Sequence, residues 1–554
     1  MPDWIDAFQS MCAIVSGEQT DEAPTRIDPS ETPFGELVDL IARWGRGTVL
    51  SSEWLTESAR TDLYESLCDR IEEVVAQPLH VDYHRFVDDV ESLTASSSDH
   101  YDSYIAAFRS GRYERFFTEF AVAARLLVTV VRQWREATRE LCVRLDADHG
   151  SIASMLGVDR LGPVTGVDPG SGDAHNRGRT VTILDFEAGR VVYKPRSVAP
   201  ERGFFRFLST VTDALTELPA FPTPDVIERD GYGWMEHVAS GSFSDLAAVG
   251  TYYERAGALT WLLTLLGTTD LHAENLIAAD ESPVVVDAET VIPPTTEPSG
   301  TFTDDRIRVA AIQSSPLRSS LVPFRTDETT RDRSGFGMVS AAESHRPTIR
   351  WEEVGTDAID IRYERGEIVP QENYPKYDGD PVPPRLFADR MVAGFERAQA
   401  ATLSTTANLV DKVTTAFENT PIRVLLRESL FYQFLLDTVS NPEFLRDGAA
   451  HERRVVDALL DYWSATGLPT TVRERIVTAE RDAILRRDIP RFVVPADGTD
   501  LWMGDRIVVP DRYATSGVAE AKRRIERLDE SHAARQRGLF RATVTDTSLL
   551  RGDG

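Results

Sequence analysis

Apolar residues recur at helical spacing along much of the chain, and the clearest case is residues 113–145. One face of that segment is apolar, and the opposite face carries arginine and glutamate. The same pattern predicts a helical region over residues 34–145, a short helix over 1–16, and later helices over 200–215, 252–266, 385–417, 422–439, 451–464, 470–487 and 518–537.

Runs of β-branched and aromatic residues predict strands between these helices. Residues 180–186 and 190–195 flank a Glu-Ala-Gly turn and form a predicted hairpin. Two segments show neither pattern. Residues 17–34 are polar and proline-bearing, which is typical of a flexible segment, and residues 293–380 are predicted to be irregular. Shorter runs predict strands over 226–228, 233–238 and 284–287.

Composition restricts the classes of function. The 554 residues carry a formal net charge of -29, and only four of the 60 basic residues are lysines. This acidic excess argues against a nucleic-acid partner, because phosphate contacts need clustered cations. With arginine in place of lysine, it favours a protein of a high-salt, halophilic cytoplasm or of a GC-rich genome. The length predicts about two to four domains.

The cysteines and the apolar runs bound the compartment. Three cysteines lie far apart in the sequence, so we expect reduced thiols and no structural zinc site. The N-terminus lacks the basic and apolar parts of a signal peptide. The most apolar run, residues 258–266, is shorter than the about 20 residues that span a bilayer. We therefore expect a cytoplasmic protein without a membrane span.

The main chemical motif lies in residues 267–289, where G-T-T-D-L-H-A-E-N-L-I precedes V-V-V-D-A-E. Kinase-type enzymes use one Asp to orient the attacking hydroxyl, and an Asn and a second Asp to hold metal. Asp270, Asn275 and Asp287 follow this order, and Glu289 is a candidate second metal ligand. His272 is a candidate general base, phosphate donor or structural hydrogen-bonding group. The alternative is a polar capping loop between a helix and a strand.

Three further features are candidates for the same chemistry. Lys194 ends a predicted strand in V-V-Y-K-P-R, where a kinase-like lobe places its nucleotide lysine; a surface lysine is the alternative. The loop G-D-A-H-N-R-G, residues 172–178, brings glycine amides to a position suited to phosphate, although its spacing alone favours an ordinary turn. Arg423 and Arg427 are predicted to share one helix face, with a solvated arginine stripe as the alternative.

Together these motifs resemble the dehydratase domain of class II lanthipeptide synthetases. The similarity covers about residues 100–540 and continues through S-P-L-R (315–318), R-S-G-F-G (333–337), P-I-R-V-L-L-R-E-S (421–429) and D-I-P-R-F (488–492). The resemblance implies an α+β fold with a lipid-kinase-like two-lobed core. The core would consist of a small β-rich N-lobe and a helical C-lobe. Two parts would be added to this core: an N-terminal helical region and a long, irregular, peptide-engaging insertion.

The resemblance also implies an activity and a set of site residues. The activity is phosphorylation of Ser and Thr in a ribosomal precursor peptide with ATP and Mg²⁺, and then elimination of phosphate to dehydroalanine and dehydrobutyrine. The implied nucleotide-binding residues are Lys194, Asp173, His175, Asn275 and Asp287, and the implied metal ligands are Asn275, Asp287 and Glu289. The implied catalytic residues are Asp270, His272, Lys194, Arg423 and Ser429.

One of these assignments departs from the family pattern, and one catalytic role stays open. Ser429 stands where the family has a threonine, so the hydroxyl is kept and the methyl is lost. The base that removes the Cα proton is not assigned; Lys194 and His272 are both candidates, since either would have to be partly neutral at the working pH.

The implied organisation is a flexible segment over 1–34, a helical region over 35–160, an N-lobe over 161–250, a C-lobe over 251–545 that includes the insertion at 293–380, and a tail over 546–554. Full-length family members continue into a zinc-dependent cyclase, and no Cys/His cluster of that kind is found here. The chain is therefore either a stand-alone dehydratase, whose products would need a separate zinc-dependent cyclase for ring closure, or a dehydratase truncated before its cyclase. The expected substrate is a precursor peptide with a leader and a Ser/Thr/Cys-rich core. A kinase that stops at the phosphopeptide and a non-catalytic peptide-binding subunit are the alternatives.

Overall fold

The computed structural model describes residues 4–17, 31–91, 99–170, 172–296, 312–323, 334–337, 342–368, 371–464 and 468–545. The protein is mixed α+β, 56% helical and 15% strand with several small sheets, which confirms the predicted α+β class. Residues 1–3 and 18–30 of the predicted flexible segment, and the whole predicted tail, lie outside the described residues, while α1 (Trp4–Val15) is the predicted short helix and corrects the flexible assignment there. The chain forms two compact units: unit 1 is Met1–Pro195, His345–Gly366 and Leu425–Arg491, and unit 2 is Arg196–Ser344, Glu367–Val424 and Phe492–Gly554.

Unit 1 is built on long helices, two of which, α3 and α6, are each 35 residues long. The indole of Trp134 on α6 donates a hydrogen bond of 3.1 Å to Ser66 Oγ on α3, inside the apolar interface between them. The helices are α1 (Trp4–Val15), α2 (Gly35–Arg46), α3 (Glu57–Glu91), α4 (His100–Ala107), α5 (Tyr113–Glu119), α6 (Ala121–Met155), α12 (Ser429–Val439), α13 (Gly448–Ser464) and α14 (Thr470–Ile484). Short helical turns occupy Val49–Ser51, Phe108–Arg112 and Pro442–Leu445.

The predicted helix over 113–145 is two helices. Phe120 leaves helical geometry, with φ -100° and ψ 57°, and separates α5 from α6. The ring of Phe120 is fully buried and lies 5.1 Å from that of Phe116. Burial of aromatic rings at the bend therefore outweighs the continuous helical periodicity that the sequence shows.

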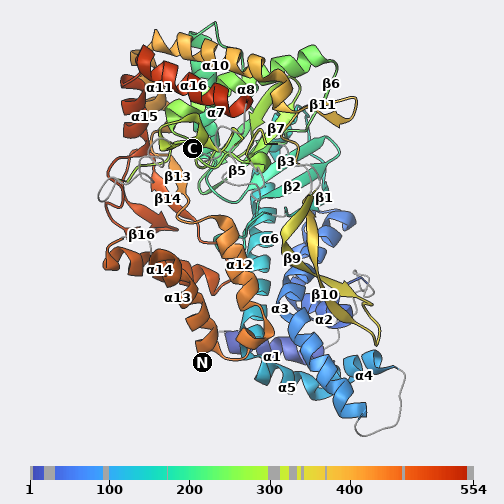
Figure 1. Ribbon diagram of the computed structural model, residues 1–554. Helices are drawn as coiled ribbons and strands as arrows, with labels where there is room; N and C mark the ends of the chain where they lie inside the picture. The colour runs from blue at the N-terminus through green and yellow to red at the C-terminus, as the bar shows by residue number, and fades with distance from the viewer. Residues whose placement is uncertain are drawn as a thin grey trace. The chain divides into compact units, whose positions relative to one another are not determined.

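The strands of unit 1 form a meander and a separate hairpin. The strands β1 (Val164–Asp168), β2 (Thr182–Phe186) and β3 (Gly189–Lys194) pair antiparallel in sequence order, so the predicted hairpin is confirmed. Its turn depends on Gly189, whose φ of 147° other residues rarely adopt. A second pair, β9 (Ala342–Glu352) and β10 (Asp360–Ile368), appears in Figure 1 as the yellow hairpin near α3.

The hairpin β9–β10 corrects the expectation that residues 293–380 are irregular throughout. Thr348 to Trp351, and Ile361 to Glu364, alternate apolar and polar residues with the period of two that a strand requires. Each run is short and flanked by charged residues, and this masks the alternation in the sequence.

Unit 2 has a core of closely packed helices, with α10, α11, α15 and α16 gathered near α8 in Figure 1. The α8 and α10 backbones touch: a Cβ on Gly257 would lie 1.8 Å from the carbonyl oxygen of Met391. The helices are α7 (Ala199–Ala214), α8 (Leu246–Leu266), α10 (Ala388–Leu403), α11 (Thr406–Phe417), α15 (Gly517–Glu526) and α16 (Glu530–Thr545). Short helical turns occupy Ala273–Asn275, Pro316–Ser319 and Pro384–Phe387.

Four small groups of strands complete unit 2. The strands β4 (Val226–Arg229) and β5 (Tyr232–Glu236) form one antiparallel pair, and β7 (Leu276–Ala279) and β8 (Ser282–Val285) form another. A three-stranded sheet holds β6 (Ser242–Phe243), β11 (Lys376–Tyr377) and β12 (Asp380–Pro381). A four-stranded sheet runs β13 (Pro421–Val424), β14 (Phe492–Pro495), β15 (Leu501–Met503) and β16 (Arg506–Val509).

The first part of the predicted helix over 422–439 is wrong. Residues 421–424 form β13, which pairs antiparallel with β14 so that Arg423 faces Val493. The partner strand comes from a distant part of the sequence, so local periodicity could not reveal it. Arg423 and Arg427 therefore do not share a helix face: Arg423 lies on a strand of unit 2, and Arg427 lies before α12 in unit 1.

Two other predicted helices are divided. The helix over 385–417 is α10 and α11, separated at Ser404 and Thr405, and the helix over 518–537 is α15 and α16, separated at residues 527–529. Among the described residues, no helix combines the length and the apolarity that crossing a membrane requires.

Candidate active site

The loop that carries Asp270 begins where α8 ends. Gly267 caps the helix in the left-handed conformation, with φ 74°, and Asp270 is itself left-handed, with φ 61°. Two threonine hydroxyls fix the loop to the chain beyond β8. Thr268 Oγ1 and Thr290 Oγ1 donate to backbone carbonyl oxygens across the gap at 2.7 and 2.6 Å. Asp270 is therefore held by a rigid loop rather than by a mobile one.

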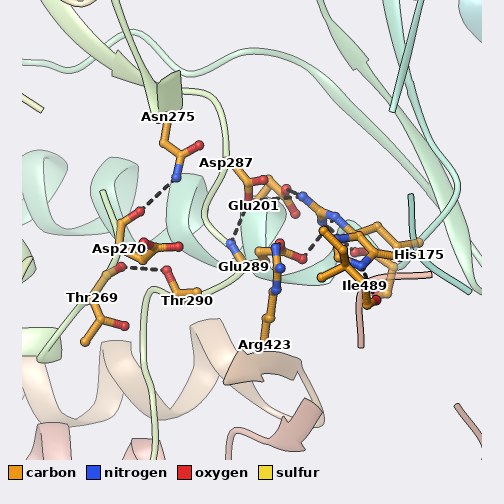
Figure 2. A network of polar contacts seen from close by, with 12 residues as sticks. His175, Glu201, Thr269, Asp270, Asn275, Asp287, Glu289, Thr290, Arg423 and Ile489 are labelled. Carbon is orange, nitrogen blue, oxygen red and sulfur yellow. Dashed lines mark hydrogen bonds and ion pairs between the residues drawn. The ribbon is translucent and has the colours of Figure 1, made fainter. Parts of the chain in front are cut away.

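Asn275 and Asp287 lie at the same end of the β7–β8 hairpin. Leu276 pairs with Val285, and the Val286 amide donates to the carbonyl oxygen of Asn275 at 3.0 Å. The Asn275 side chain donates through Nδ2 to the backbone carbonyl oxygen of Asp270 at 2.8 Å, as Figure 2 shows. This bond orients the amide and leaves its Oδ1 as an acceptor that could face a cation.

Glu289 is held between two arginines. Its Oε1 lies 2.5 Å from Arg423 Nη1, and its Oε2 lies 3.2 Å from Arg196 Nε. Arg196 also reaches Asp287 Oδ1 at 3.0 Å and Glu201 Oε1 at 2.8 Å. We call this group the carboxylate–arginine cluster; its members are Arg196, Glu201, Asp270, Asp287, Glu289 and Arg423.

Charge within the cluster is not balanced. Four carboxyl groups face two guanidinium groups, which leaves an excess of negative charge when all four are ionised. Burial would lower the pKa of both arginines, but the carboxylates raise the pKa of Arg196 well above its ordinary value and also raise that of Arg423. Both arginines therefore stay charged.

Burial and the surrounding negative charge make Asp270 hold its proton more tightly than an ordinary aspartate does. Burial raises the pKa of Asp270 from 3.8 to about 6; His272 and Arg423 oppose the shift, and the carboxylates of Asp287 and Glu289 add to it. A carboxyl group that titrates near neutral pH can accept a proton from a hydroxyl more readily than an ordinary aspartate can. His272 lies beside it, about one-third exposed, and its Nδ1 accepts from the Glu274 amide at 3.4 Å.

Asn275 and the cluster residue Asp287 together offer donor atoms that fit a hard divalent cation. Asn275 Oδ1 and the Asp287 carboxylate are oxygen ligands of the kind that Mg²⁺ prefers. Asp287 uses Oδ1 for both Arg196 and the Glu289 amide, so Oδ2 is the oxygen that could face an ion. Both carboxylate oxygens of Glu289 are engaged by arginines, so its predicted role as a metal ligand would require one of these ion pairs to open.

The remaining predicted residues belong to unit 1. Lys194 is the last residue of β3 and is buried, with 3% of its surface exposed. Asp173 Oδ1 accepts from Gln433 Nε2 on α12 at 2.7 Å, and His175 Nδ1 lies 2.7 Å from the carbonyl oxygen of Ile489. Ser429 is the first residue of α12.

The glycine-bearing loop is held by a carboxylate. The amides of Arg177 and Gly178 donate to the two carboxylate oxygens of Asp488, each at 2.7 Å. Both residues have positive φ, a backbone geometry that forms anion-binding nests. These two amides therefore serve Asp488 in the structure.

The structure groups the predicted residues by unit. Asp270, His272, Asn275, Asp287, Glu289 and Arg423 come together in unit 2. Asp173 and His175 lie in one loop of unit 1, while convergence of Lys194 and Ser429 with the unit 2 group stays a prediction. Sequence reasoning missed Arg196, Glu201, Gln433 and Asp488. Two of them carried a usable signal: Arg196 is part of V-V-Y-K-P-R and lies two residues after Lys194, and Asp488 begins the motif D-I-P-R-F.

The burial of Arg427 shows that the alternative of a solvated arginine stripe is wrong for this residue. Its guanidinium is fully buried and forms two bonds to Glu480, Nε to Oε1 at 2.6 Å and Nη2 to Oε2 at 2.7 Å. The rings of Phe431, Tyr462 and Trp463 surround it at 4.4 to 4.8 Å. Arg427 is a structural centre of unit 1 and not a surface charge.

Comparison with known proteins places the chain in a family. Residues 120–495 match the family described as a domain of unknown function, DUF4135, which is found in lantibiotic synthetases. This match covers more than half of the chain, so the protein belongs to the DUF4135 family.

One curated relative carries a more specific name. The Lacticin 481/lactococcin biosynthesis protein LcnDR2 of Lactococcus lactis subsp. lactis is 20% identical over 287 residues, which are 49% of this chain and 31% of the relative. The match therefore spans about a third of the relative's length. The two findings together confirm the resemblance to class II lanthipeptide synthetases that the motifs indicate.

Proposed function

We propose that this chain is a lanthipeptide dehydratase, which phosphorylates Ser and Thr residues of a precursor peptide with ATP and then eliminates the phosphate. The observation that carries the proposal is the arrangement around Asp270. A proton-accepting carboxyl group lies beside an oriented amide, a strand-end carboxylate and two charged arginines, all in one rigid cluster. Membership of the DUF4135 family and the likeness to a lantibiotic biosynthesis protein support the proposed substrate class, a lanthipeptide precursor.

The proposal includes a lipid-kinase-like, two-lobed core that binds ATP. Lys194 would pair with the nucleotide phosphates, and Asp173 and His175 would also contact the nucleotide. Support comes from the chain itself: only Pro195 separates Lys194 from Arg196, which is bonded to Asp287. Asn275 and Asp287 would hold Mg²⁺, which supplies charge neutralisation at the phosphates.

In the first reaction, Asp270 orients the peptide hydroxyl and takes its proton. The hydroxyl oxygen forms a bond to the γ-phosphorus, the bond between that phosphorus and the β,γ-bridging oxygen breaks, and ADP leaves with the electron pair. The raised pKa of Asp270 suits this role, since the group is largely ionised at neutral pH and still accepts a proton readily.

In the second reaction, a base removes the Cα proton, a carbon–carbon double bond forms, and the bond from Cβ to the phosphate oxygen breaks. The phosphate departs as an anion. Arg423 is suited to bind it, because its guanidinium stays charged and could exchange Glu289 for the two phosphate oxygens. Ser429 would supply the side-chain hydroxyl that the family's threonine provides for the elimination half-reaction. Lys194 and His272 are the two candidates for the base.

Co-expression of the full chain with Ser/Thr/Cys-rich peptides from neighbouring reading frames, followed by mass spectrometry, tests the proposal. The wild-type protein is expected to remove one water per modified residue. Asp287→Asn should leave the peptide unmodified. Arg423→Lys keeps the charge but loses the planar fork, so phosphorylated peptide should accumulate.

Arg506→Lys is the matched control, since Arg506 is exposed on β16 of the same sheet. It should behave as wild type. Wild-type protein that yields only phosphopeptide would identify a kinase without elimination. Unchanged modification by Asp287→Asn would refute the enzyme proposal and favour a peptide-binding subunit.

A further inference from the structure

Two histidines one helical turn apart meet a carboxylate from a different element, away from the carboxylate–arginine cluster. His80 and His84 lie on α3, and Asp360 is the first residue of β10. Their nearest ligand atoms all lie within 4.8 Å of one another. Among the described residues, this is the one such group of His, Cys, Asp or Glu atoms. All three residues belong to unit 1.

The hairpin that carries Asp360 is anchored to the helices, so the three side chains are positioned in advance. In the turn before β10, the Asp357 carboxylate accepts the backbone amides of Asp99 and Tyr101 at 3.0 and 2.7 Å. The Tyr83 hydroxyl on α3 donates to the Asp357 carbonyl oxygen at 3.0 Å. These bonds fix the turn against α3 and α4, three residues from Asp360.

His80 is held by its own packing. The Trp351 ring meets the imidazole edge-on, with ring centroids 5.5 Å apart, and the His80 side chain is only 12% exposed. The backbone of Ile359 lies within hydrogen-bonding reach of the same ring. Outer partners of this kind fix ring orientation at metal sites and leave the other ring nitrogen to face the ion.

The ligand atoms converge on each other at distances that suit a shared cation. His80 Nε2 lies 2.9 Å from His84 Nε2 and 3.4 Å from Asp360 Oδ1. A tetrahedral ion with bonds of about 2.0–2.1 Å keeps its ligand atoms about 3.3 Å apart, so only a small opening of the histidine pair is required. Two imidazoles at i and i+4 on one helix face are a recurrent metal-binding pair.

We propose that His80, His84 and Asp360 bind a divalent transition-metal ion of the Zn²⁺ class. Imidazole nitrogens favour Zn²⁺ and related ions over Mg²⁺ and Ca²⁺, which prefer oxygen ligands. The ion ties the β9–β10 hairpin to α3. Asp360 is 69% exposed, so solvent water completes the coordination and the ion can exchange with solution. The site is separate from the proposed Mg²⁺ ligands and does not depend on the proposed function.

Titration of the chelator-treated full chain with ZnCl₂, and separately with Co²⁺ followed by its visible absorption, tests the site. Wild type should bind one ion saturably. His84→Ala and Asp360→Asn should each weaken binding at least about tenfold. His149→Gln is the matched control, because His149 is exposed on α6, where it contacts the carbonyl oxygen of Asp146 and the ring of Trp54 and no part of the proposed site.

Two outcomes would overturn the proposal: equal binding by His84→Ala, Asp360→Asn and wild type, or loss of the ion in Asp287→Asn, which would assign it to the carboxylate–arginine cluster. The hairpin gives an independent readout. Arg362 on β10 is 67% exposed, so trypsin should cut after it. Zn²⁺ should slow that cut in wild type and not in Asp360→Asn; an unchanged rate in wild type would show that the ion does not tie the hairpin to α3.

Discussion

Replacing Asp270 with asparagine should abolish activity and at the same time stabilise the folded protein. Asparagine keeps the size of the side chain and tolerates the left-handed backbone, φ 61°, so the substitution introduces little strain. It removes a negative charge that lies among Asp287 and Glu289 in a largely buried position. The proposed base is lost with that charge.

The raised pKa of Asp270 sets both the size and the pH range of the effect. The carboxyl group of Asp270 binds its proton more tightly in the folded state than in the unfolded one. The stabilisation that this bound proton gives is fully present below pH 3.8 and is lost as the pH rises through about 6. At about 1.4 kcal/mol per pKa unit, the ionised group costs at most about 3 kcal/mol at pH 8. Asp270→Asn should recover that amount at pH 8 and about half of it at pH 5.

Urea unfolding of both proteins at pH 5 and pH 8 measures the difference, without added divalent ions. Asp280→Asn is the matched control: Asp280 is also left-handed, with φ 49°, but it lies in the turn between β7 and β8, outside the cluster. It should change stability by less than about 0.5 kcal/mol at either pH. An Asp270→Asn protein that is less stable than wild type at pH 8, or equally stabilised at both pH values, would refute the account of the cluster.

Two further substitutions test the packing of each unit by urea unfolding. Glu480→Gln removes the buried charge partner of Arg427 and should lower the free energy of unfolding by about 3–5 kcal/mol. The control Glu364→Gln breaks an exposed ion pair and should lower it by less than about 1 kcal/mol. Similar losses in both variants would contradict the distinction between a buried and an exposed pair. Gly257→Ala should destabilise the protein by at least about 3 kcal/mol, because the new Cβ meets a backbone oxygen of α10. The control Gly150→Ala lies in open space on α6 and should stabilise the protein by about 0.5–1 kcal/mol. A Gly257→Ala protein as stable as wild type would contradict the close packing of α8 and α10.

The sequence predicted those parts of the site whose residues lie close together in the chain. Asp270, Asn275 and Asp287 fall within one helix, loop and hairpin, so their spacing alone determines how they lie relative to one another. The hairpin that ends at Lys194 was predictable for the same reason. Local turn chemistry and strand alternation carry this information, and both are visible in a short window.

What the sequence could not show are pairings between distant segments. Arg423 was assigned to a helix because its partner strand, β14, is remote in sequence. Arg427 had the composition of a surface arginine, and only its burial against Glu480 reveals its structural role. The metal ligands proposed at His80 and Asp360 are likewise far apart, and a fold must first bring α3 and β10 together.

Glu289 shows how such distant segments become one chemical unit. Its amide donates to Asp287 Oδ1, and its carbonyl oxygen accepts the Arg423 amide at 2.7 Å. Its two carboxylate oxygens hold Arg196 and Arg423. One residue therefore positions the strand-end carboxylate and both arginines, which come from distant parts of the sequence of unit 2. A buried charge is tolerated only where its partners are fixed. By fixing these partners, Glu289 allows two arginines and a larger number of carboxylates to lie buried together. That surplus is the property on which binding of a cation, and hence of a nucleotide phosphate, would depend.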